Sequence, residues 1–438
     1  MIRAPCGTTA RPAGNRPMST KEAHIDPDRY KEATAHYLAG LAEDSPLSFD
    51  VIDSDGNIVF KTGQRIRPDV IEGLSKRGKR FYVPRMGRDG DFSRQIFSQE
   101  MMHNLIEDTS ALFSDIRRLG TMTHEQYINA CNQYGFLLQR LLPQDKAGGV
   151  LTLLHRARSG SHSAMHSVNV GLLAMIYSYK NGDPQEKIMN MAISGFLHDV
   201  GKQKVDENII LKPGALTREE FSAMMDHTKE GYRILDAVKN DKGDKVIPNV
   251  VKIVSLFHHR RLKSQGYPFK EGATRDDSER SYLELPAEAR IIGIMDLYDA
   301  VTTNTPYRKS TGIESALRYI LNLSGYLYTV EDVHSFLRVM GLTLNHGKSF
   351  LNPGDFVVLE SVKVHPETRK KSRTYEFAKV EELYRSGLLT PKVTIFFNAS
   401  KNTRINPISI DLHYDTSRKV VRVIHSPRLM GMMQRYMK

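Results

Sequence analysis

The stretch ISGFLHDVGK, residues 193–202, places His198 and Asp199 side by side at the end of an apolar segment. Its apolar residues have helical spacing, so both polar side chains are expected at or near a helical core. A single histidine on an apolar helix face is usually an ordinary core residue. A buried carboxylate without a cation is costly, however, so Asp199 needs a positively charged partner.

Four other segments repeat this combination of helical apolar spacing with histidine or aspartate. No Lys or Arg recurs beside each histidine as a general counter-charge, whereas metal ions would satisfy the whole set. One transition metal takes about four ligands, so these imidazoles and carboxylates predict two ions. Such ligands suit Fe, Mn, Ni, Co or Zn, of which we favour Fe or Mn. The segments are SAMHSVNVGLLAMIYSY with His166, EEFSAMMDHTKEGYRIL with His227, VVKIVSLFHH with His258 and His259, and RIIGIMDLYDAV with Asp296.

Two divalent ions about 4 Å apart can hold a hydroxide and polarise a phosphoryl oxygen. Lys202 follows His198 by one helical turn and could neutralise a phosphate, although its spacing equally fits a solvated lysine. The segment HHRRLKSQGYP, residues 258–268, adds several cations beside two of the histidines. Its last three residues could flank a substrate or only shape a turn, because Gly and Pro restrict the backbone in special ways.

The composition is that of an ordinary folded protein with 438 residues, 40% hydrophobic and 26% charged, which predicts two or three domains. No apolar run approaches the about 18 residues of a membrane span. The two cysteines, Cys6 and Cys131, exclude a disulfide framework and fit a cytoplasmic protein. A formal charge of +12 favours anionic partners, but scattered basic residues form no nucleic-acid-binding stripe.

Hydrophobic patterning divides the chain into successive segments. The segment FDVIDSDGNIVF carries an Asp-Gly hairpin signal, and PDVIEGLSKRG has the pattern of a short helix. Near the other end, KVTIFFNAS, ISIDLHY and KVVRVIHS are short β-branched runs. The expected fold class is mainly α, with a central helical bundle between a small α+β module and a β-rich segment. We predict a disordered basic tail and lead-in over 1–45, the α+β module over 46–91, connecting helices over 92–149, the helical domain over 150–345 and the β-rich segment over 346–438.

The motifs of the central region occur in a recognisable order. They are HS, FLHDVGK, H before KEGYRIL, HH leading to GYP, and ARIIGIMDLYDAVTTNTPYR. Over about residues 150–345 the chain resembles the HD-GYP family, a branch of the HD-domain phosphohydrolases that hydrolyses the bacterial messenger cyclic di-GMP. The resemblance implies an HD-type bundle that opens cyclic di-GMP to pGpG, with further hydrolysis to GMP left open. It also implies that the GYP loop or the flanking domains could dock a signalling protein.

Carried over by position, the resemblance implies one metal bound by His166, His198, Asp199 and Asp296. Asp199 would also bridge to a second metal held by His227, His258 and His259. Lys202 would face the scissile phosphate, and Asp199 and Lys202 would be the catalytic pair. Relatives with a third ion use a glutamate where His162 stands, so we expect His162 to be an ordinary helix neighbour. The residues implied to contact substrate are Lys202, Arg260, Arg261, Lys263, Gly266, Tyr267, Pro268 and Arg308.

The basic loop departs from the family pattern. Arg260, Lys263 and Ser264 stand where the family has Glu, Asp and Gly, and Thr305 replaces an arginine. The gained bases could compensate by attracting phosphate, or could disturb hydrogen bonds that orient the histidines. Three functions stay open. A cyclic di-GMP phosphodiesterase is favoured because every inferred ligand is present; a catalytically weak or inactive cyclic di-GMP receptor or adaptor and an HD phosphohydrolase of another nucleotide are the alternatives.

Overall fold

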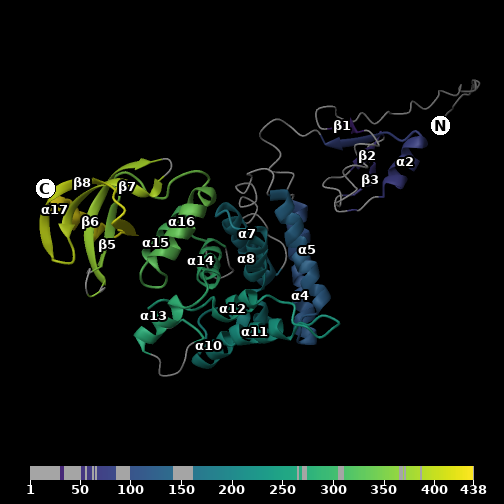
Figure 1. Cartoon of the computed structure of the whole chain (residues 1–438), viewed down its shortest axis with the longest axis horizontal. Helices are drawn as coiled ribbons and strands as arrows, with labels where there is room; N and C mark the ends of the chain where they lie inside the picture. The colour runs from purple at the N-terminus through teal and green to yellow at the C-terminus, as the bar shows by residue number, and fades with distance from the viewer. Residues whose placement is uncertain are drawn as a thin grey trace, which may run out of the picture. The chain divides into compact units, whose positions relative to one another are not determined.

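The computed structural model divides the chain into two compact units, Met1–Ile96 and Phe97–Lys438. Most of the predicted tail, residues 1–45, lies outside the described residues. Figure 1 shows the helices of the larger unit in blue, teal and green, followed by a yellow-green sheet at the C-terminal end. The structure describes residues 30–33, 51–54, 57–61, 64, 67–84, 99–141, 161–263, 266–268, 274–303, 310–364, 368, 371–384 and 387–437.

The smaller unit contains a four-stranded antiparallel sheet and one described helix. The helix α2 (Pro68–Lys76) begins with proline, whose missing N–H is not needed in a first turn. The buried apolar residues of this unit include Val51, Phe60, Ile71 and Phe81. The strand order is β1-β4-β2-β3, with β1 (Tyr30–Ala33), β2 (Val51–Asp53), β3 (Ile58–Phe60) and β4 (Phe81–Pro84).

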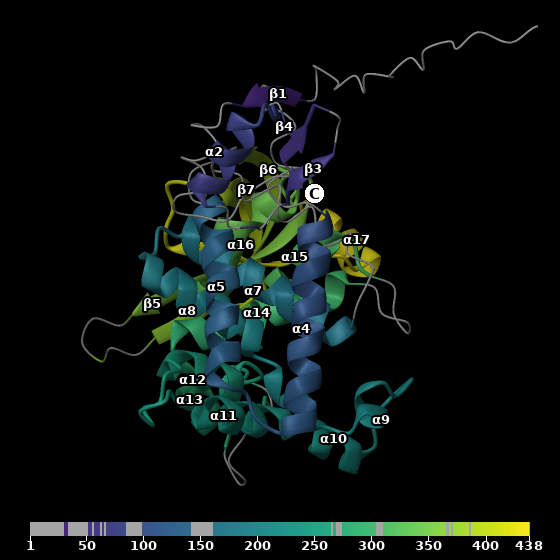
Figure 2. The same cartoon turned by 90° about the vertical axis from the view of Figure 1, so that its right-hand side faces the viewer.

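The larger unit begins with a layered helical bundle. The helices α7 and α8 are apolar on most sides, which fits their burial at the centre of the bundle. They pack closely, since an added Cβ at Gly195 would lie 2.7 Å from the Val170 carbonyl oxygen. Helix α4 packs on α7 and α5 on α8, and Figure 2 shows both as long helices over the bundle. The first part of the bundle comprises α4 (Gln99–Leu119), α5 (His124–Leu141), α7 (His162–Lys180), α8 (Gln185–Leu197) and the 3-10 helix η1 (Val200–Lys204).

The remaining helices complete the bundle and surround the predicted site. Helix α12 contacts both α8 and α14, and α11 lies against η1 and α12. These contacts bring together the ends of helices that are far apart in the sequence. The helices are α9 (Glu207–Ile210), α10 (Arg218–Met225), α11 (His227–Ala237), α12 (Asn249–Phe257), α13 (Arg275–Leu283), α14 (Ala287–Thr302), α15 (Ile313–Asn322) and α16 (Val330–Leu344).

A five-stranded antiparallel sheet follows, in the order β8-β7-β6-β5-β9. Its edge strand β9 packs on α15, where the Asn322 amide exchanges two hydrogen bonds with the Val423 backbone. The strand β6 was not anticipated, because its many charged residues conceal the alternation of a strand with one exposed face. The elements are β5 (Phe356–Val364), β6 (Lys371–Tyr384), β7 (Gly387–Asn398), β8 (Thr403–Asp411), β9 (Arg418–Val423) and α17 (Pro427–Met437).

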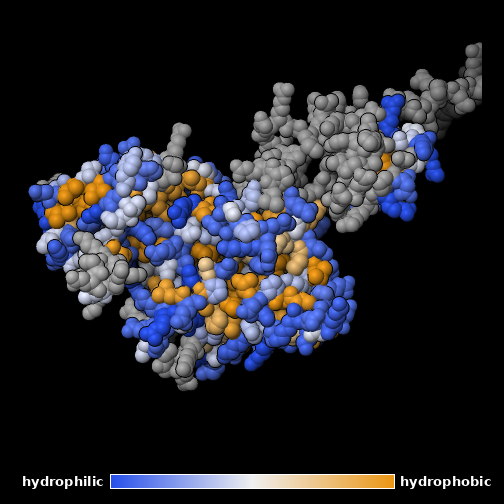
Figure 3. Space-filling model, in the orientation of Figure 1, coloured by the Kyte–Doolittle hydropathy of each residue, from blue (hydrophilic) through white to orange (hydrophobic). Residues whose placement is uncertain are grey.

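The predicted fold class is therefore confirmed: helices dominate, with a small sheet near the N-terminus and a larger one near the C-terminus. On the face drawn in Figure 3, hydrophilic residues predominate and apolar residues gather in small groups. Among the described residues, no helix has both the length and the apolarity that crossing a membrane would require.

Candidate metal centre

The structure brings all the predicted metal ligands together. His166 lies on α7 and Asp296 on α14, while the others stand at or beside the ends of α8, α11 and α12. In each of two groups, the candidate ligand atoms all lie within 4.8 Å of one another. One group is Asp199, His227, His258 and His259, and the other is His166, His198 and Asp296.

Asp199 lies between the two groups, and its oxygens face different histidines. Its Oδ2 is 3.4 Å from His198 Nε2 and 3.7 Å from His166 Nε2. Its Oδ1 is 3.2 Å from His227 Nε2 and 3.5 Å from His258 Nε2. A carboxylate in this position can bridge two cations.

Asp296 also contacts both groups. Its Oδ1 lies 3.2 Å from His166 Nε2, and its Oδ2 lies 3.7 Å from His259 Nδ1. The two carboxylates thus stand among the imidazoles, and each of the five histidines has one ring nitrogen within ion-pair distance of a carboxylate oxygen. Such a set of nitrogen and carboxylate donors suits divalent transition metals.

Backbone carbonyls orient three of the histidines. Nδ1 of His198 lies 2.7 Å from Gly195 O, and Nδ1 of His227 lies 2.6 Å from Met224 O. Nδ1 of His258 lies 3.0 Å from Ser255 O. Because a carbonyl only accepts hydrogen bonds, each Nδ1 carries the proton and each Nε2 presents a lone pair to the centre.

A glycine in the HDVGK motif allows two of these segments to meet. An added Cβ at Gly201 would lie 1.9 Å from the His227 carbonyl oxygen and 2.4 Å from Gly231 N. No larger residue fits there without moving η1 away from α11. Gly201 therefore keeps Asp199 close to His227.

Asp299 is a functional candidate that the sequence analysis missed. It is 1% exposed, and its Oδ2 accepts from His166 Nδ1 at 2.7 Å. Its Oδ1 accepts from Asn169 Nδ2 at 2.8 Å, which fixes the carboxylate. A carboxylate behind a metal-binding histidine sets the ring orientation and raises its basicity. The sequence does place Asp299 one helical turn after Asp296, on the same face of α14, and this spacing could have identified it.

Two buried atoms of the centre lack hydrogen-bond partners among the described residues. They are Asp199 Oδ1 and His198 Nε2, in residues that are 1% and 0% exposed. Buried polar atoms are nearly always satisfied, so these orphaned lone pairs indicate an absent partner. Because both atoms are electron-pair donors, a metal cation fits them.

Electrostatics set the charge of each group in the centre. Burial opposes ionisation of Asp199, but the charge of Lys202 outweighs it, and with the hydrogen bonds of His198 and His227 it holds the pKa of Asp199 well below its ordinary value. Burial lowers the pKa of Lys202, yet Asp199 raises it more, so the ammonium stays protonated. Burial and the neighbouring histidines lower the pKa of His258 to about 4 despite Asp199, so its ring is neutral. His166 is basic instead: burial lowers its pKa, but Asp296 and Asp299 raise it to about 10.

The GYP segment folds directly against the centre. The Tyr267 ring lies on the His259 ring, with centroids 4.5 Å apart. The neighbouring Gly266 permits this, since an added Cβ would lie 2.4 Å from His259 O. Pro268 follows in the same described segment, whereas Ser264, Thr305 and Arg308 lie outside the described residues. His162 begins α7 and is exposed.

The predicted phosphate-binding cations of this loop contact protein acceptors. Arg260 donates to Pro268 O at 2.9 Å and also to Ser281 Oγ. Arg261 donates to His258 O at 2.9 Å, and Lys263 donates to Gly325 O at 3.0 Å. These contacts favour a structural interpretation of the basic loop over attraction of phosphate.

Residues 151–328 match the family model of the HD domain. The similarity extends to curated cyclic di-GMP phosphodiesterases. The central region of this chain is therefore an HD domain. One relative, the cyclic di-GMP phosphodiesterase of Thermotoga maritima, is 34% identical over 174 residues, covering 40% of this chain and 44% of that protein.

Two further relatives differ in the substrate that their names give. A cyclic di-GMP phosphodiesterase of Pseudomonas aeruginosa is 28% identical over 263 residues, which are 60% of this chain and 55% of the relative. The 3'3'-cGAMP-specific phosphodiesterase 3 of Vibrio cholerae is 31% identical over 143 residues, which are 33% of this chain and 27% of the relative. The chain thus spans about half the length of the first two relatives.

Proposed function

We propose that this protein is a member of the HD-GYP family and a metal-dependent phosphodiesterase that hydrolyses cyclic di-GMP to pGpG. The observation that carries the proposal is the position of Asp199, whose two oxygens face two separate groups of histidines. Two divalent ions, Fe or Mn, would supply an activated hydroxide and polarise the phosphoryl oxygen. The names of the relatives support cyclic di-GMP as the substrate.

Two sets of residues would each bind one ion. His166, His198 and Asp296 would hold one ion and His227, His258 and His259 the other, with Asp199 shared between them. Asp299 would orient His166, as its hydrogen bond to Nδ1 indicates. The remaining ring orientations come from the backbone carbonyls described above.

Lys202 would act on the substrate. Its side chain is 24% exposed and its ammonium donates to Asp199 Oδ2. A protonated amine at the edge of the centre can neutralise charge on the phosphate that is being attacked. Asp199 fixes the amine in place, so the two catalytic candidates depend on each other.

A second substrate, 3'3'-cGAMP, is favoured by one observation. Relatives whose names specify this compound are 29–31% identical to this chain over 112–153 residues. The two cyclic dinucleotides differ in one base, while the metal centre described here acts on the phosphodiester that both contain. The base-contacting residues therefore decide between them.

The experiment uses the full chain, purified without oxygen and loaded with Fe²⁺ or Mn²⁺. It is incubated with cyclic di-GMP or 3'3'-cGAMP, and linear products are separated by chromatography. We expect pGpG from cyclic di-GMP, with no product from the variant Asp199→Ala. Asp241→Ala, which alters an exposed loop, serves as the control with wild-type activity. Tight binding of cyclic di-GMP without turnover would instead support a receptor, and turnover of 3'3'-cGAMP alone would support the second substrate.

A further inference from the structure

Arg260 is buried although it stands in a loop rich in positive charge. The residue is 7% exposed and directly follows His259. One guanidinium nitrogen, Nη1, donates to Pro268 O, and the other, Nη2, donates to Ser281 Oγ on α13. The planar fork of the guanidinium suits this double attachment, which a lysine cannot reproduce.

The two attachments close the GYP loop on itself and on α13. The backbone adds a parallel link, because Tyr267 N donates to His259 O at 3.2 Å. There is no room for a side chain at Gly266 between these links. Residues 266–268 are thus tied to His259 through the backbone and to Arg260 through its side chain.

The closed loop supports a candidate metal ligand. Tyr267 lies on the His259 ring and is 6.0 Å, centroid to centroid, from the His227 ring. Phe221 of α10 packs edge-on against Tyr267 from another side, at 6.1 Å. If the loop loosens, Tyr267 no longer limits the orientation of His259.

Attraction of substrate would require a different placement of Arg260. A phosphate would have to displace Pro268 O and Ser281 Oγ, and would have to reach a side chain that is almost completely covered. The neighbouring Arg261 shows the same use of charge, since it donates to His258 O and lies over the Tyr328 ring at 5.1 Å. The cations of this loop therefore hold protein segments together.

We propose that Arg260 is a positioning residue that clamps the GYP loop, so that Tyr267 holds His259 in its metal-binding orientation. The inference rests on the proposed function, because it assumes that His259 binds an ion. Its effect depends on the geometry of the guanidinium, not on the positive charge.

The experiment measures metal binding without turnover. Wild type, Arg260→Lys, Ser281→Ala and Arg280→Met are titrated with Co²⁺, whose visible absorption reports the geometry of its ligands. Arg260→Lys keeps the charge but loses the fork, and Ser281→Ala removes one acceptor only. Arg280→Met, at an exposed position on α13 beside Ser281, removes a charge without changing the hydrogen bonds of Arg260.

We expect about 10-fold weaker binding of one Co²⁺ and an altered spectrum for Arg260→Lys, with a smaller change in the same direction for Ser281→Ala. Arg280→Met should match wild type.

Activity gives a second reading of the same variants. Arg260→Lys should lower kcat about 10-fold and change KM less than about 2-fold, because substrate does not contact this residue. Wild-type Co²⁺ affinity, spectrum and kcat in Arg260→Lys would overturn the proposal. So would a raised KM with an unchanged spectrum in Arg260→Lys. Melting of the metal-free variants identifies a folding defect, in which case Ser281→Ala decides. An inactive wild type that still shows the Co²⁺ effects would count against the proposed function alone.

Discussion

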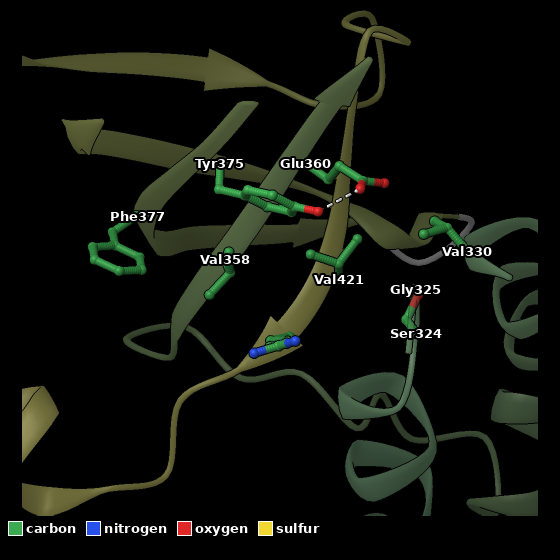
Figure 4. A pocket seen from close by; sticks show the side chains of 9 residues that line it. Ser324, Gly325, Val330, Val358, Glu360, Tyr375, Phe377 and Val421 are labelled. Atoms are coloured by element: carbon green, nitrogen blue, oxygen red, sulfur yellow. Dashed lines mark hydrogen bonds between the residues drawn. The ribbon is translucent and has the colours of Figure 1, made fainter. Parts of the chain in front are cut away.

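The metal centre and a hollow on the C-terminal sheet both bury a carboxylate, but they satisfy it in different ways. In the hollow of about 340 Å³, Glu360 accepts from the Tyr375 hydroxyl at 3.0 Å, as Figure 4 shows. Arg373 adds a cation 3.6 Å from the same oxygen. In the metal centre, Asp199 Oδ1 has no hydrogen-bond partner among the described residues.

This difference separates a structural acid from a candidate metal ligand. Glu360 is 6% exposed and Asp199 1% exposed, so burial alone does not distinguish them. The partners do: Glu360 meets a hydroxyl and a guanidinium of its own sheet, whereas Asp199 Oδ1 faces two histidine lone pairs. Lone pairs facing one another inside a protein require a cation between them.

The largest expected effect comes from removing the shared carboxylate. Asp199→Asn should lower phosphodiesterase activity at least about 1,000-fold, because a neutral amide binds divalent metals poorly and leaves both ions without their bridge. Glu360→Gln, at the other buried acid, should keep activity within about 2-fold. Product chromatography and elemental analysis of the bound metal measure both variants. Equal losses in the two variants would remove the distinction between the two regions.

A buried histidine outside the centre should make stability depend on pH. Burial lowers the pKa of His334 to about 4, and its Nε2 donates to Val420 O at 2.7 Å across the boundary between α16 and β9. Since the unfolded ring has an ordinary pKa near 6.5, the unfolded state binds the proton first. Stability should therefore fall as the pH drops from about 6.5 to 4, by up to about 3 kcal/mol.

The matched variant for this prediction is His334→Gln, which retains a donor but does not titrate. Denaturant unfolding of metal-free protein at pH 7 and pH 4 gives the difference between the two proteins. Metal-free samples remove the competition between protons and metal, and the centre's own histidines cancel in the comparison. An identical loss of stability in both proteins would show that the pKa of His334 does not differ between the folded and the unfolded state.

The residue behind His166 should have an intermediate effect. Asp299→Asn keeps the shape but weakens acceptance from His166 Nδ1, so we expect about 10- to 100-fold lower activity with the same metal. Metal titration should show a matching loss of affinity. Glu381→Gln changes an exposed acid on β6 and provides the control. Unchanged kinetics and affinity would mean that Asp299 only stabilises the bundle.

The smallest effect is expected in the hollow. Tyr375→Phe removes the hydroxyl that donates to Glu360, which should cost about 1 kcal/mol of stability while Arg373 stays near the carboxylate. Activity should remain at the wild-type level. A large loss of activity in this variant would connect the C-terminal sheet with catalysis, and Glu360 would then not be a purely structural acid.

The sequence predicted much of the site because its signals are local. Apolar helical spacing around His166, His198 and Asp296 placed these residues on the inner faces of helices, and the resemblance supplied the sharing of Asp199. The partners of Asp299 and Arg260 could not be predicted, since they depend on how α7, α13 and α14 pack.

The same limit applies to the fold. The Asp-Gly signal predicted a local hairpin, and the strands β2 and β3 on both sides of it pair antiparallel as expected. The neighbours β5 and β9 are separated by three other strands in the sequence, and no local pattern specifies that pairing. Strand β6 was not predicted from the sequence because its charged face resembles a solvated loop.

The central claim is that Asp199 bridges two metal ions. Electron paramagnetic resonance of the Mn²⁺-loaded protein tests it directly, because two ions that share a carboxylate couple magnetically. The account predicts two Mn²⁺ per chain with an exchange-coupled spectrum, replaced in Asp199→Asn by isolated or lost ions. A wild-type protein that binds a single Mn²⁺ with an uncoupled spectrum would contradict it.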